Sequence, residues 1–293
     1  MKKIISKIRG TKPYQQQNFT RVMTDRKRLV IFFSENPAHT FDVLSFIINW
    51  TKLFKEFVCI IPAFSYTFFK RITLFENMKY LNLSSNLNPF PESIIFNFSK
   101  EKHISKLLKQ CKNSTIIDIN NPSNIQFVPT PDDPVTLFEN FAGFFNFPLN
   151  KADIKIELSP SESNITKHRF IQNRFHNFVL DINQPGSGKR NENLIAALKQ
   201  NFFANIYLTG RKINKKNFIN IINFEIENLY EMYSLAKESD LFLSDNLALV
   251  GIFAKLGVNL IYLGEKVRTE DYKCIEPQNV FELKNVIPEV MKK

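Results

Sequence analysis

The residues best suited to chemistry lie where a strand runs into a glycine-rich turn. An apolar run at Phe178–Ile182 leads into residues 183–190, Asn-Gln-Pro-Gly-Ser-Gly-Lys-Arg, and Asn191–Gln200 has the pattern of an amphipathic helix. A helix start beside glycines offers backbone N–H groups to an anion. The turn is therefore expected to bind a phosphate-bearing ligand, and the residues expected to do so are Gly186, Ser187, Gly188, Lys189 and Arg190.

A second strand and helix follow about forty residues further on. Leu229–Ser239 is typical of a helix, Leu241–Leu243 of a buried strand and Leu247–Leu256 of another helix. Ser244, Asp245 and Asn246 form the turn before this last helix, whose first backbone amides are a second candidate anion site. Together with the glycine-rich turn they are expected to outline one pocket.

The spacing of the glycine-rich turn excludes an ATP-binding P-loop. That motif needs Gly, four residues, then Gly-Lys and Ser or Thr. With Gly188-Lys189 as the pair, the first position is Asn183 and the last is Arg190, so both ends fail. A dinucleotide fingerprint with three spaced glycines fails as well.

Composition indicates a folded chain with anionic partners. The 293 residues suggest two domains, and a hydrophobic fraction of 44% with 30 Phe supplies large cores. The net charge of +11 favours phosphates, nucleic acid or lipid headgroups. Nucleic acid is the weakest of these, because no recognised nucleic-acid motif accompanies the charge.

The cysteines and the apolar segments favour a cytoplasmic location. Cys59, Cys111 and Cys274 show neither metal-ligand spacing nor a disulfide framework. The apolar stretch Phe57–Phe69 is too short for a bilayer, which needs about 20 residues. Met1–Arg9 lacks the apolar core of a secretory signal.

The first 28 residues are predicted to form a basic arm. They hold nine Lys and Arg side chains against the single acid Asp25, and Ile4, Ile5 and Ile8 can share one helix face. Such an arm suits the inner face of an anionic membrane, with peripheral attachment. The alternative is a frayed, solvated terminus.

Apolar runs alternate with helix-length segments, as in parallel α/β proteins. The expected strands are 29–33, 57–61, 79–83, 94–98, 115–119, 178–182, 205–208, 219–224, 241–243 and 258–263. The remaining expected helices are 40–55, 65–75, 100–112, 135–147 and 280–291. The polar, turn-rich residues 159–164 are the expected domain boundary. The predicted organisation is an arm at 1–28, α/β domains at 29–160 and 165–275, and a C-terminal segment at 276–293 that can cross back to the first domain.

These motifs resemble glycosyltransferase family nine, the heptosyltransferase class, over residues 29–265. In that family a strand leads to Pro-Gly-Ala-Ser and then Lys-Arg-Trp, and residues 185–190 match with Asn191 where Trp is usual. The family also has an Asp-Ser-Gly turn with a His three residues after the Gly. Here Asp245 is kept, whereas Leu247 replaces the Gly and Val250 the His.

The resemblance also implies a catalytic base in the first half. The family places a Gly-Asp-Val-Leu-like turn after its first strand, and Phe41-Asp42-Val43-Leu44 corresponds. Asp42 is therefore expected to accept the proton of the acceptor hydroxyl, with His39 or Glu35 as alternatives. A purely structural alternative is that Asp42 caps a helix start.

The resemblance implies an α/β protein with two Rossmann-like lobes of the GT-B type and a cleft between them. It implies an inverting, metal-independent transferase that moves a sugar from a nucleotide-sugar donor to a glycan or glycolipid acceptor of the cell envelope. Residues 186–190 and 244–246 would bind the donor, and no cofactor or metal is expected. The alternative is a catalytically silent relative that serves as a binding module, since the donor-site Gly and His are missing.

Overall fold

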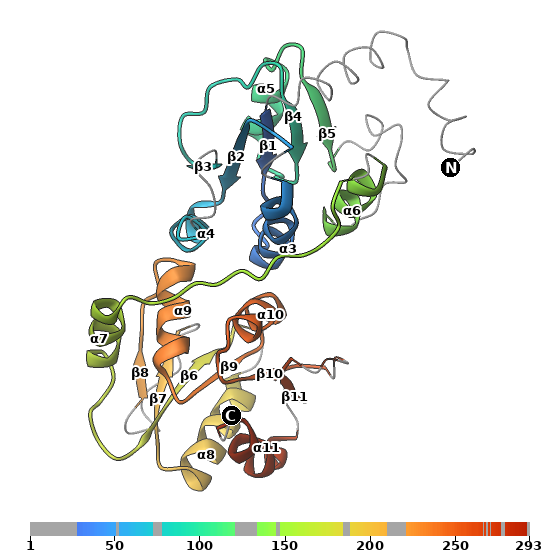
Figure 1. Ribbon diagram of the computed structural model, residues 1–293. Coiled ribbons are helices and arrows are strands. Elements are labelled where there is room, and N and C mark those ends of the chain that lie inside the picture. The colour runs from blue at the N-terminus through green and yellow to red at the C-terminus, as the bar shows by residue number, and fades with distance from the viewer. Residues whose placement is uncertain are drawn as a thin grey trace. The chain divides into compact units, whose positions relative to one another are not determined.

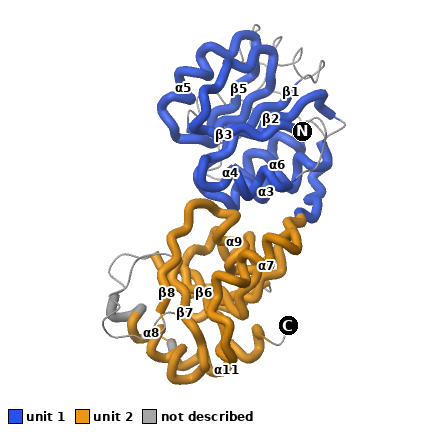
Figure 2. Tube along the Cα trace, turned by 90° about the vertical axis from the view of Figure 1, so that its left-hand side faces the viewer, with its two compact units in different colours: residues 1–154 blue, residues 155–293 orange. Residues whose placement is uncertain are grey.

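The computed structural model describes two compact units. The described residues are 28–50, 53–72, 78–120, 134–144, 147–183, 188–209, 221–265, 267, 269, 271–276 and 279–291. The first unit comprises residues 1–154 and the second residues 155–293 (Figure 2). Each unit is an α/β domain with its own parallel sheet.

The first unit is built on a five-stranded parallel sheet in the order β3-β2-β1-β4-β5 (Figure 1). Its strands are β1 (Arg28–Phe32), β2 (Glu56–Ile61), β3 (Met78–Asn82), β4 (Ile94–Asn97) and β5 (Thr115–Asp118). Its helices are α3 (Pro37–Ile47), followed by a 3₁₀ turn at Ile48–Trp50, α4 (Ala63–Phe69), α5 (Lys102–Leu108) and α6 (Pro134–Phe144).

Aromatic packing fills one side of this sheet. Trp50 stacks on Phe138 with ring centroids 4.7 Å apart, and its Nε1–H donates to the carbonyl oxygen of Pro148 at 2.8 Å. Phe96 of β4 meets Phe138 and Phe141 of α6. On the other face Val30, Val58 and Ile95 pack against the helix α5. Because both faces are covered, the central strands β1, β2 and β4 are mostly apolar, as parallel strands usually are.

The second unit is built on a six-stranded parallel sheet in the order β11-β10-β9-β6-β7-β8. Its strands are β6 (His176–Asp181), β7 (Ala204–Leu208), β8 (Ile221–Asn223), β9 (Leu241–Ser244), β10 (Leu260–Leu263) and β11 (Lys273–Ile275). Its helices are α7 (Pro160–His168), α8 (Gly188–Asn201), α9 (Leu229–Glu238), α10 (Leu247–Lys255) and, after a 3₁₀ turn at Val280–Glu282, α11 (Leu283–Val290).

Helices cover both faces of the second sheet (Figure 1). Helices α8 and α11 share one core with strand residues such as Leu180 and Leu243. Helices α9 and α10 meet on the other face, where Phe253 packs against Tyr233 and Phe242. The helix α11 packs in the core of its own unit, because Leu283, Ile287 and Val290 form one apolar stripe.

The segment expected as a turn-rich boundary is a helix. Ser159 accepts the backbone N–H of Glu162, and the Glu162 carboxylate accepts the N–H of Ser159, which is a complete capping box. Pro160 at the first helical position supports the same start. Ser, Pro and Glu cap a helix here, but these residue types are also common in turns. This explains why the sequence predicted a turn where the structure has the start of α7.

Most predicted elements match the structure within a few residues. The sequence missed α7 and the short edge strand β11, and it began the first helix at Thr40, whereas α3 begins at Pro37 behind the cap Asn36. The basic arm lies outside the described residues except for Arg28, which begins β1. Within the part of the chain that the structure describes, no helix is long and apolar enough to span a membrane.

Candidate functional sites

Each sheet has one position where its strand order reverses. In the first unit β1 lies between β2 and β4, and in the second unit β6 lies between β7 and β9. Loops that leave such neighbouring strands in opposite directions open a crevice at the carboxyl ends of the strands, where α/β proteins bind ligands. The two candidate sites are the crevice between β1 and β4 and the crevice between β6 and β9.

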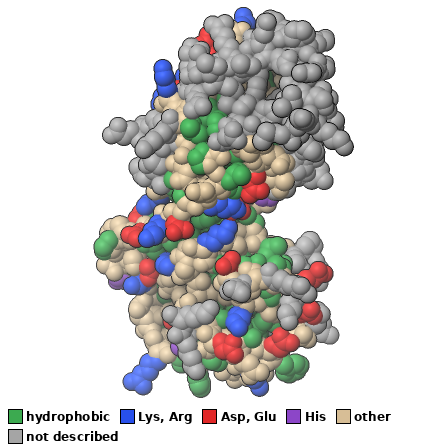
Figure 3. Space-filling view, turned by 45° about the vertical axis from the view of Figure 1, so that its right-hand side comes forward, with side chains coloured by type: hydrophobic (Ala, Val, Ile, Leu, Met, Phe, Trp, Pro, Cys, Tyr) green, Lys and Arg blue, Asp and Glu red, His purple; other side chains and the backbone are tan. Residues whose placement is uncertain are grey.

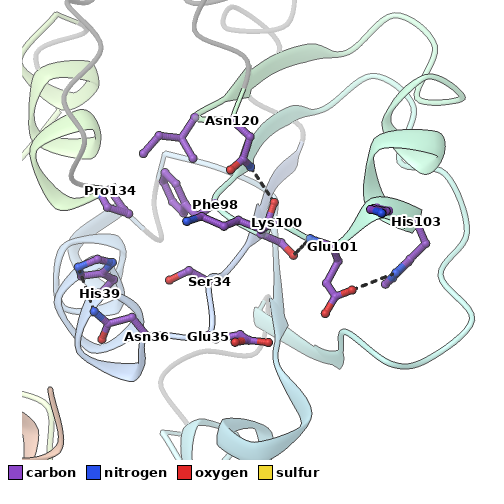
Figure 4. Close-up of a pocket in the computed structure, with 13 residues that line it drawn as sticks. Ser34, Glu35, Asn36, His39, Phe98, Lys100, Glu101, His103, Asn120 and Pro134 are labelled. Carbon is purple, nitrogen blue, oxygen red and sulfur yellow. Dashed lines mark hydrogen bonds and ion pairs between the residues drawn. The ribbon is translucent and has the colours of Figure 1, made fainter. Parts of the chain in front are cut away.

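The crevice of the first unit is an open pocket of about 1170 Å³ (Figure 4). Its lining comes from the loop after β1, the loop after β4, the end of β5 and the start of α6. The lining residues are Ser34, Glu35, Asn36, His39, Phe98, Ser99, Lys100, Glu101, Lys102, His103, Ile119, Asn120 and Pro134. This volume is large enough for a sugar-sized or larger ligand.

Asn36 organises the first wall of the pocket. Its Oδ1 accepts the N–H of Ala38 at 3.0 Å, which caps α3 and fixes the orientation of the amide group. Its Nδ2 then lies 3.2 Å from His39 Nε2. Because an amide nitrogen only donates, Nε2 of His39 is the acceptor and the ring proton is on Nδ1.

A polar network fixes the opposite wall. Asn97 Nδ2 donates to Asp118 Oδ1 at 2.9 Å, and Asn97 Oδ1 accepts the N–H of Ser99 at 3.1 Å. Asn120 Nδ2 donates to the carbonyl oxygen of Ser99 at 2.7 Å. The ends of β4 and β5 are thereby tied together, and they hold the loop that carries Lys100, which extends over the pocket (Figure 4).

The pocket presents both signs of charge and a polar atom without a partner. Lys100 and Lys102 are exposed, as are the carboxylates of Glu35 and Glu101, and Glu101 lies 3.9 Å from His103 Nδ1. The hydroxyl of Ser34 is buried and has no hydrogen-bond partner. A ligand with hydroxyl groups and a negative charge would match this lining.

Asp42 does not line the pocket. It lies in the second turn of α3, with Oδ1 3.8 Å from Lys151 Nζ, and that ammonium group lies 5.0 Å from the ring centroid of Phe46. The interpretation of Asp42 as a helix cap is wrong, since Asn36 is the cap. The catalytic role of Asp42 stays a prediction.

The point where the strand order of the second sheet reverses is bordered by a buried polar row. Asp181 pairs in register with Ser244 on β9, and Thr209 follows the last residue of β7 on the other side. Ser244 Oγ donates to Asp181 Oδ2 at 3.1 Å, and Thr209 Oγ1 lies 3.4 Å from Asp181 Oδ1. Burial raises the pKa of Asp181, although hydrogen bonds from Asn183, Ser244 and Thr209 oppose the shift.

The side chains of Asp245 and Asn246 accept hydrogen bonds from the protein backbone. Both carboxylate oxygens of Asp245 accept the N–H of Asn183, at 3.1 and 3.0 Å. Asn246 Oδ1 accepts the N–H groups of Ala248 and Leu249, so this side chain caps α10. The amides of Ala248 and Leu249 are therefore occupied by the protein's own cap.

The glycine-rich turn is only partly described. Gly186 and Ser187 lie outside the described residues, whereas Gly188 begins α8 and Lys189 and Arg190 lie in its first turn. The described part of the structure does not include the side chains of Lys189 and Arg190. Their donor-binding role stays a prediction, as does that of residues 244–246.

Two features of these sites were not expected from the sequence. Asp181 lies inside an apolar run that predicts a plain strand, although a buried acidic residue at the carboxyl end of a strand is a usable signal. Ser34 and Lys100 were not singled out, because a pocket depends on how two distant loops fold. Among the described residues, no group of three or more His, Cys, Asp or Glu side chains is arranged to hold a metal ion.

Comparison with solved structures decides the fold. The glycosyl transferase family 9 protein of Veillonella parvula matches with a TM-score of 0.58 and 10% identity, over 92% of this chain and 96% of that one. This chain has the GT-B fold. No protein-family model and no curated protein matches the sequence.

Other GT-B structures match to a similar degree. E. coli ADP-heptose lps heptosyltransferase II has a TM-score of 0.54 at 11% identity, over 90% of this chain and 99% of that one. The UDP-GlcNAc 2-epimerase of Methanocaldococcus jannaschii has a TM-score of 0.53 at 14% identity, over 91% and 93%. Transferases and an epimerase thus share the fold, and the chain is a divergent example of it.

Proposed function

We propose that the protein is a glycosyltransferase that moves a sugar from a nucleotide-sugar donor to a hydroxyl group of a cell-envelope glycan or glycolipid. The observation that carries this proposal is the open pocket at the switch point of the first unit, in a chain whose fold matches a family 9 transferase along almost its whole length. We propose an inverting reaction without a metal ion, on the inner face of the membrane.

On the donor side, the leaving group of the reaction is a nucleoside diphosphate, and its developing charge needs fixed donors. The start of α8 supplies backbone N–H groups, and Lys189 or Arg190 would add a cation. Asp245 and Asn246 would shape this site through the backbone, because their described hydrogen bonds are to Asn183, Ala248 and Leu249.

On the acceptor side, the attacking hydroxyl group must lose a proton to a nearby base. Asp42 is the base implied by the resemblance, whereas Glu35 and His39 line the pocket. Glu35 is the better placed of these two, since Nε2 of His39 already accepts from Asn36. Lys100 and Lys102 suit a phosphate or carboxylate group on the acceptor.

A binding module without catalysis is the second candidate. Leu247 stands where the family has Gly and is exposed, and Val250 stands where the family has His and is buried. Neither can donate a side-chain hydrogen bond to a diphosphate. In this alternative the protein keeps the GT-B fold and binds a ligand but does not catalyse sugar transfer.

A thermal-shift titration of the wild-type protein and Lys189→Ala with ADP, UDP and sugar nucleotides tests the donor site. Binding to the folded state raises the melting temperature by mass action. We expect a shift in the wild type that Lys189→Ala reduces. No shift with any nucleotide would reject the transferase.

Glu35→Gln and Asp42→Asn then separate the base candidates. With a bound donor, release of the nucleoside diphosphate in the presence of an acceptor extract is expected to fall about 100-fold or more in the variant that lacks the base. The other variant is the matched control. Binding without turnover by the wild type would favour the binding module.

A further inference from the structure

Asp181 is a buried carboxylate that the proposed chemistry does not use. It is 1% exposed and lies at the carboxyl end of the central strand β6. A buried carboxylate is costly unless it is hydrogen-bonded. It lies where the strand order reverses, at the point where β6 leads into the loops expected to bind the donor.

The hydrogen bonds of Asp181 reach three separate segments of the second unit. Its Oδ1 accepts from Asn183 Nδ2 at 2.7 Å, on the glycine-rich turn. Its Oδ2 accepts from Ser244 Oγ at 3.1 Å, on the last residue of β9, and Thr209 Oγ1, directly after β7, lies 3.4 Å from Oδ1. All three partners are uncharged, so the contacts fix geometry without forming an ion pair.

A second set of contacts links the same loops through the backbone. The carbonyl oxygen of Asp181 accepts the N–H of Asp245 at 3.2 Å, and Asp245 in turn holds the N–H of Asn183. Ser244 Oγ, which donates to Asp181, also accepts the N–H of Asn246 at 3.0 Å. Loss of the Asp181 carboxylate would therefore free groups on both sides of the crevice.

We propose that Asp181 is a positioning residue that holds Asn183, the residue that leads from β6 into the glycine-rich turn, against the turn before α10 and so sets the geometry of this edge of the donor site. The ligand in this inference, a nucleoside diphosphate group, rests on the proposed function. The coupling of the loops does not, because it follows from the contacts of Asp181 alone. Asp181 acts through Asn183 and Ser244 and touches no ligand itself.

The coupling is tested by hydrogen exchange on the full chain. Asp181→Ala is expected to speed exchange at least about tenfold in peptides that contain residues 183 and 245–246, with peptides of α9 unchanged. Ser239→Ala is the matched control, because this buried hydroxyl group in the same unit bonds only to the carbonyl oxygen of Ala236 in the described contacts. Exchange that stays as slow as in Ser239→Ala, or that rises equally throughout the unit, overturns the proposal.

Ser244→Ala and Asp181→Asn cover the case in which Asp181→Ala does not fold. Ser244→Ala removes one link of the network and is expected to speed exchange at residues 245–246 more than at residue 183. Asp181→Asn keeps one acceptor oxygen and is expected to lie between the wild type and Asp181→Ala. If the wild type, Ser244→Ala and Asp181→Asn exchange at the same rate at residues 183 and 245–246, the inference is wrong.

ADP and UDP affinity distinguishes positioning from plain stability. Measured well below the melting temperature, Asp181→Asn is expected to bind the nucleotide that the wild type prefers about tenfold more weakly, whereas Ser239→Ala binds as the wild type does. Unchanged affinity in Asp181→Asn overturns the positioning role. If the wild type binds neither nucleotide, the proposed function fails, and the exchange experiment still decides whether Asp181 couples the loops.

Discussion

Asp245 holds the backbone N–H of Asn183 with both of its carboxylate oxygens, at 3.1 and 3.0 Å, although the two residues are 62 positions apart. The contact joins the turn before α10 to the first residue of the glycine-rich turn. Its orientation explains how an acidic side chain can stand beside an expected phosphate site: it is engaged by the protein backbone. Asp245, which this chain shares with the resembled family, therefore has a structural role.

Asp245→Ala is expected to lower the free energy of unfolding of the second unit by about 1–3 kcal/mol, because it leaves the N–H of Asn183 without its charged acceptor. Asp245→Asn keeps one acceptor oxygen and should lose less. Urea unfolding followed by far-UV circular dichroism measures both. Wild-type stability in Asp245→Ala would show that water replaces the carboxylate at no cost.

Asp181 makes the stability of the second unit depend on pH. Burial raises the pKa of its carboxyl group above the ordinary 3.8, with a smaller contribution in the same direction from Asp245. The folded state then binds more protons than the unfolded state between these two pKa values, so the free energy of unfolding falls as the pH rises through that window. In Asp181→Asn this side chain does not titrate, so its contribution to the fall in the free energy of unfolding is absent.

We therefore expect the difference in unfolding free energy, wild type minus Asp181→Asn, to decrease as the pH rises from about 4 to about 7. Urea titrations of both proteins at several pH values measure it. The subtraction removes the contributions of the other carboxylates, which are common to both proteins. A constant difference would mean that Asp181 stays ionised throughout the range.

The sequence predicted the sheets well because buried parallel strands are nearly continuous apolar runs. Phe57–Ile61 and Phe178–Ile182 are such runs, and the structure places β2 and β6 there. It failed for α7, whose Ser159, Pro160 and Glu162 serve as helix-capping residues but look like a turn when the packing partner is unknown. It also missed β11, whose three residues become a strand only by pairing with β10.

The candidate sites were harder to predict than the fold. Ser244, Asp245 and Asn246 were found because a polar turn between a strand and a helix is a local pattern. The directions of the Ser244 and Asp245 side chains, towards Asp181 and Asn183, depend on residues about 60 positions away, whereas Asn246 caps α10 through neighbouring amides. The pocket beside Ser34 and Lys100 depends likewise on two loops that are separate in sequence.

Trp50 is the only tryptophan of the chain and reports on the first unit. It is fully buried, stacks on Phe138 and donates to Pro148. Trp50→Phe is expected to cost about 1–3 kcal/mol, because it removes a partly buried hydrogen bond and leaves unfilled volume. Urea unfolding by circular dichroism measures the loss.

The emission of Trp50 in the wild type supplies the accompanying check. It should shift to longer wavelength as the first unit unfolds, and comparison with circular dichroism shows whether the two units unfold together. A stability of Trp50→Phe equal to that of the wild type would mean that the aromatic cluster repacks fully around the smaller ring.

Two glycines of the second unit are expected to respond to the same substitution with opposite signs. Gly251 lies inside α10, and a Cβ built there meets no atom within 4 Å. Gly251→Ala should raise the free energy of unfolding by roughly 0.5–1 kcal/mol, since Ala loses less backbone entropy in a helix. At Gly264 an added Cβ would overlap the outer atoms of the Tyr262 ring, so Gly264→Ala requires this half-buried side chain to move and should cost about 0.5–1.5 kcal/mol.

A double-mutant cycle identifies the cause of the loss at Gly264. Tyr262→Ala removes the ring that the new methyl group would meet, so Gly264→Ala should cost little in that background. Urea unfolding of the four proteins gives the coupling energy between the two positions. Equal costs of Gly264→Ala with and without the Tyr262 ring would assign the effect to the backbone, and the ring contact would then have no part in it.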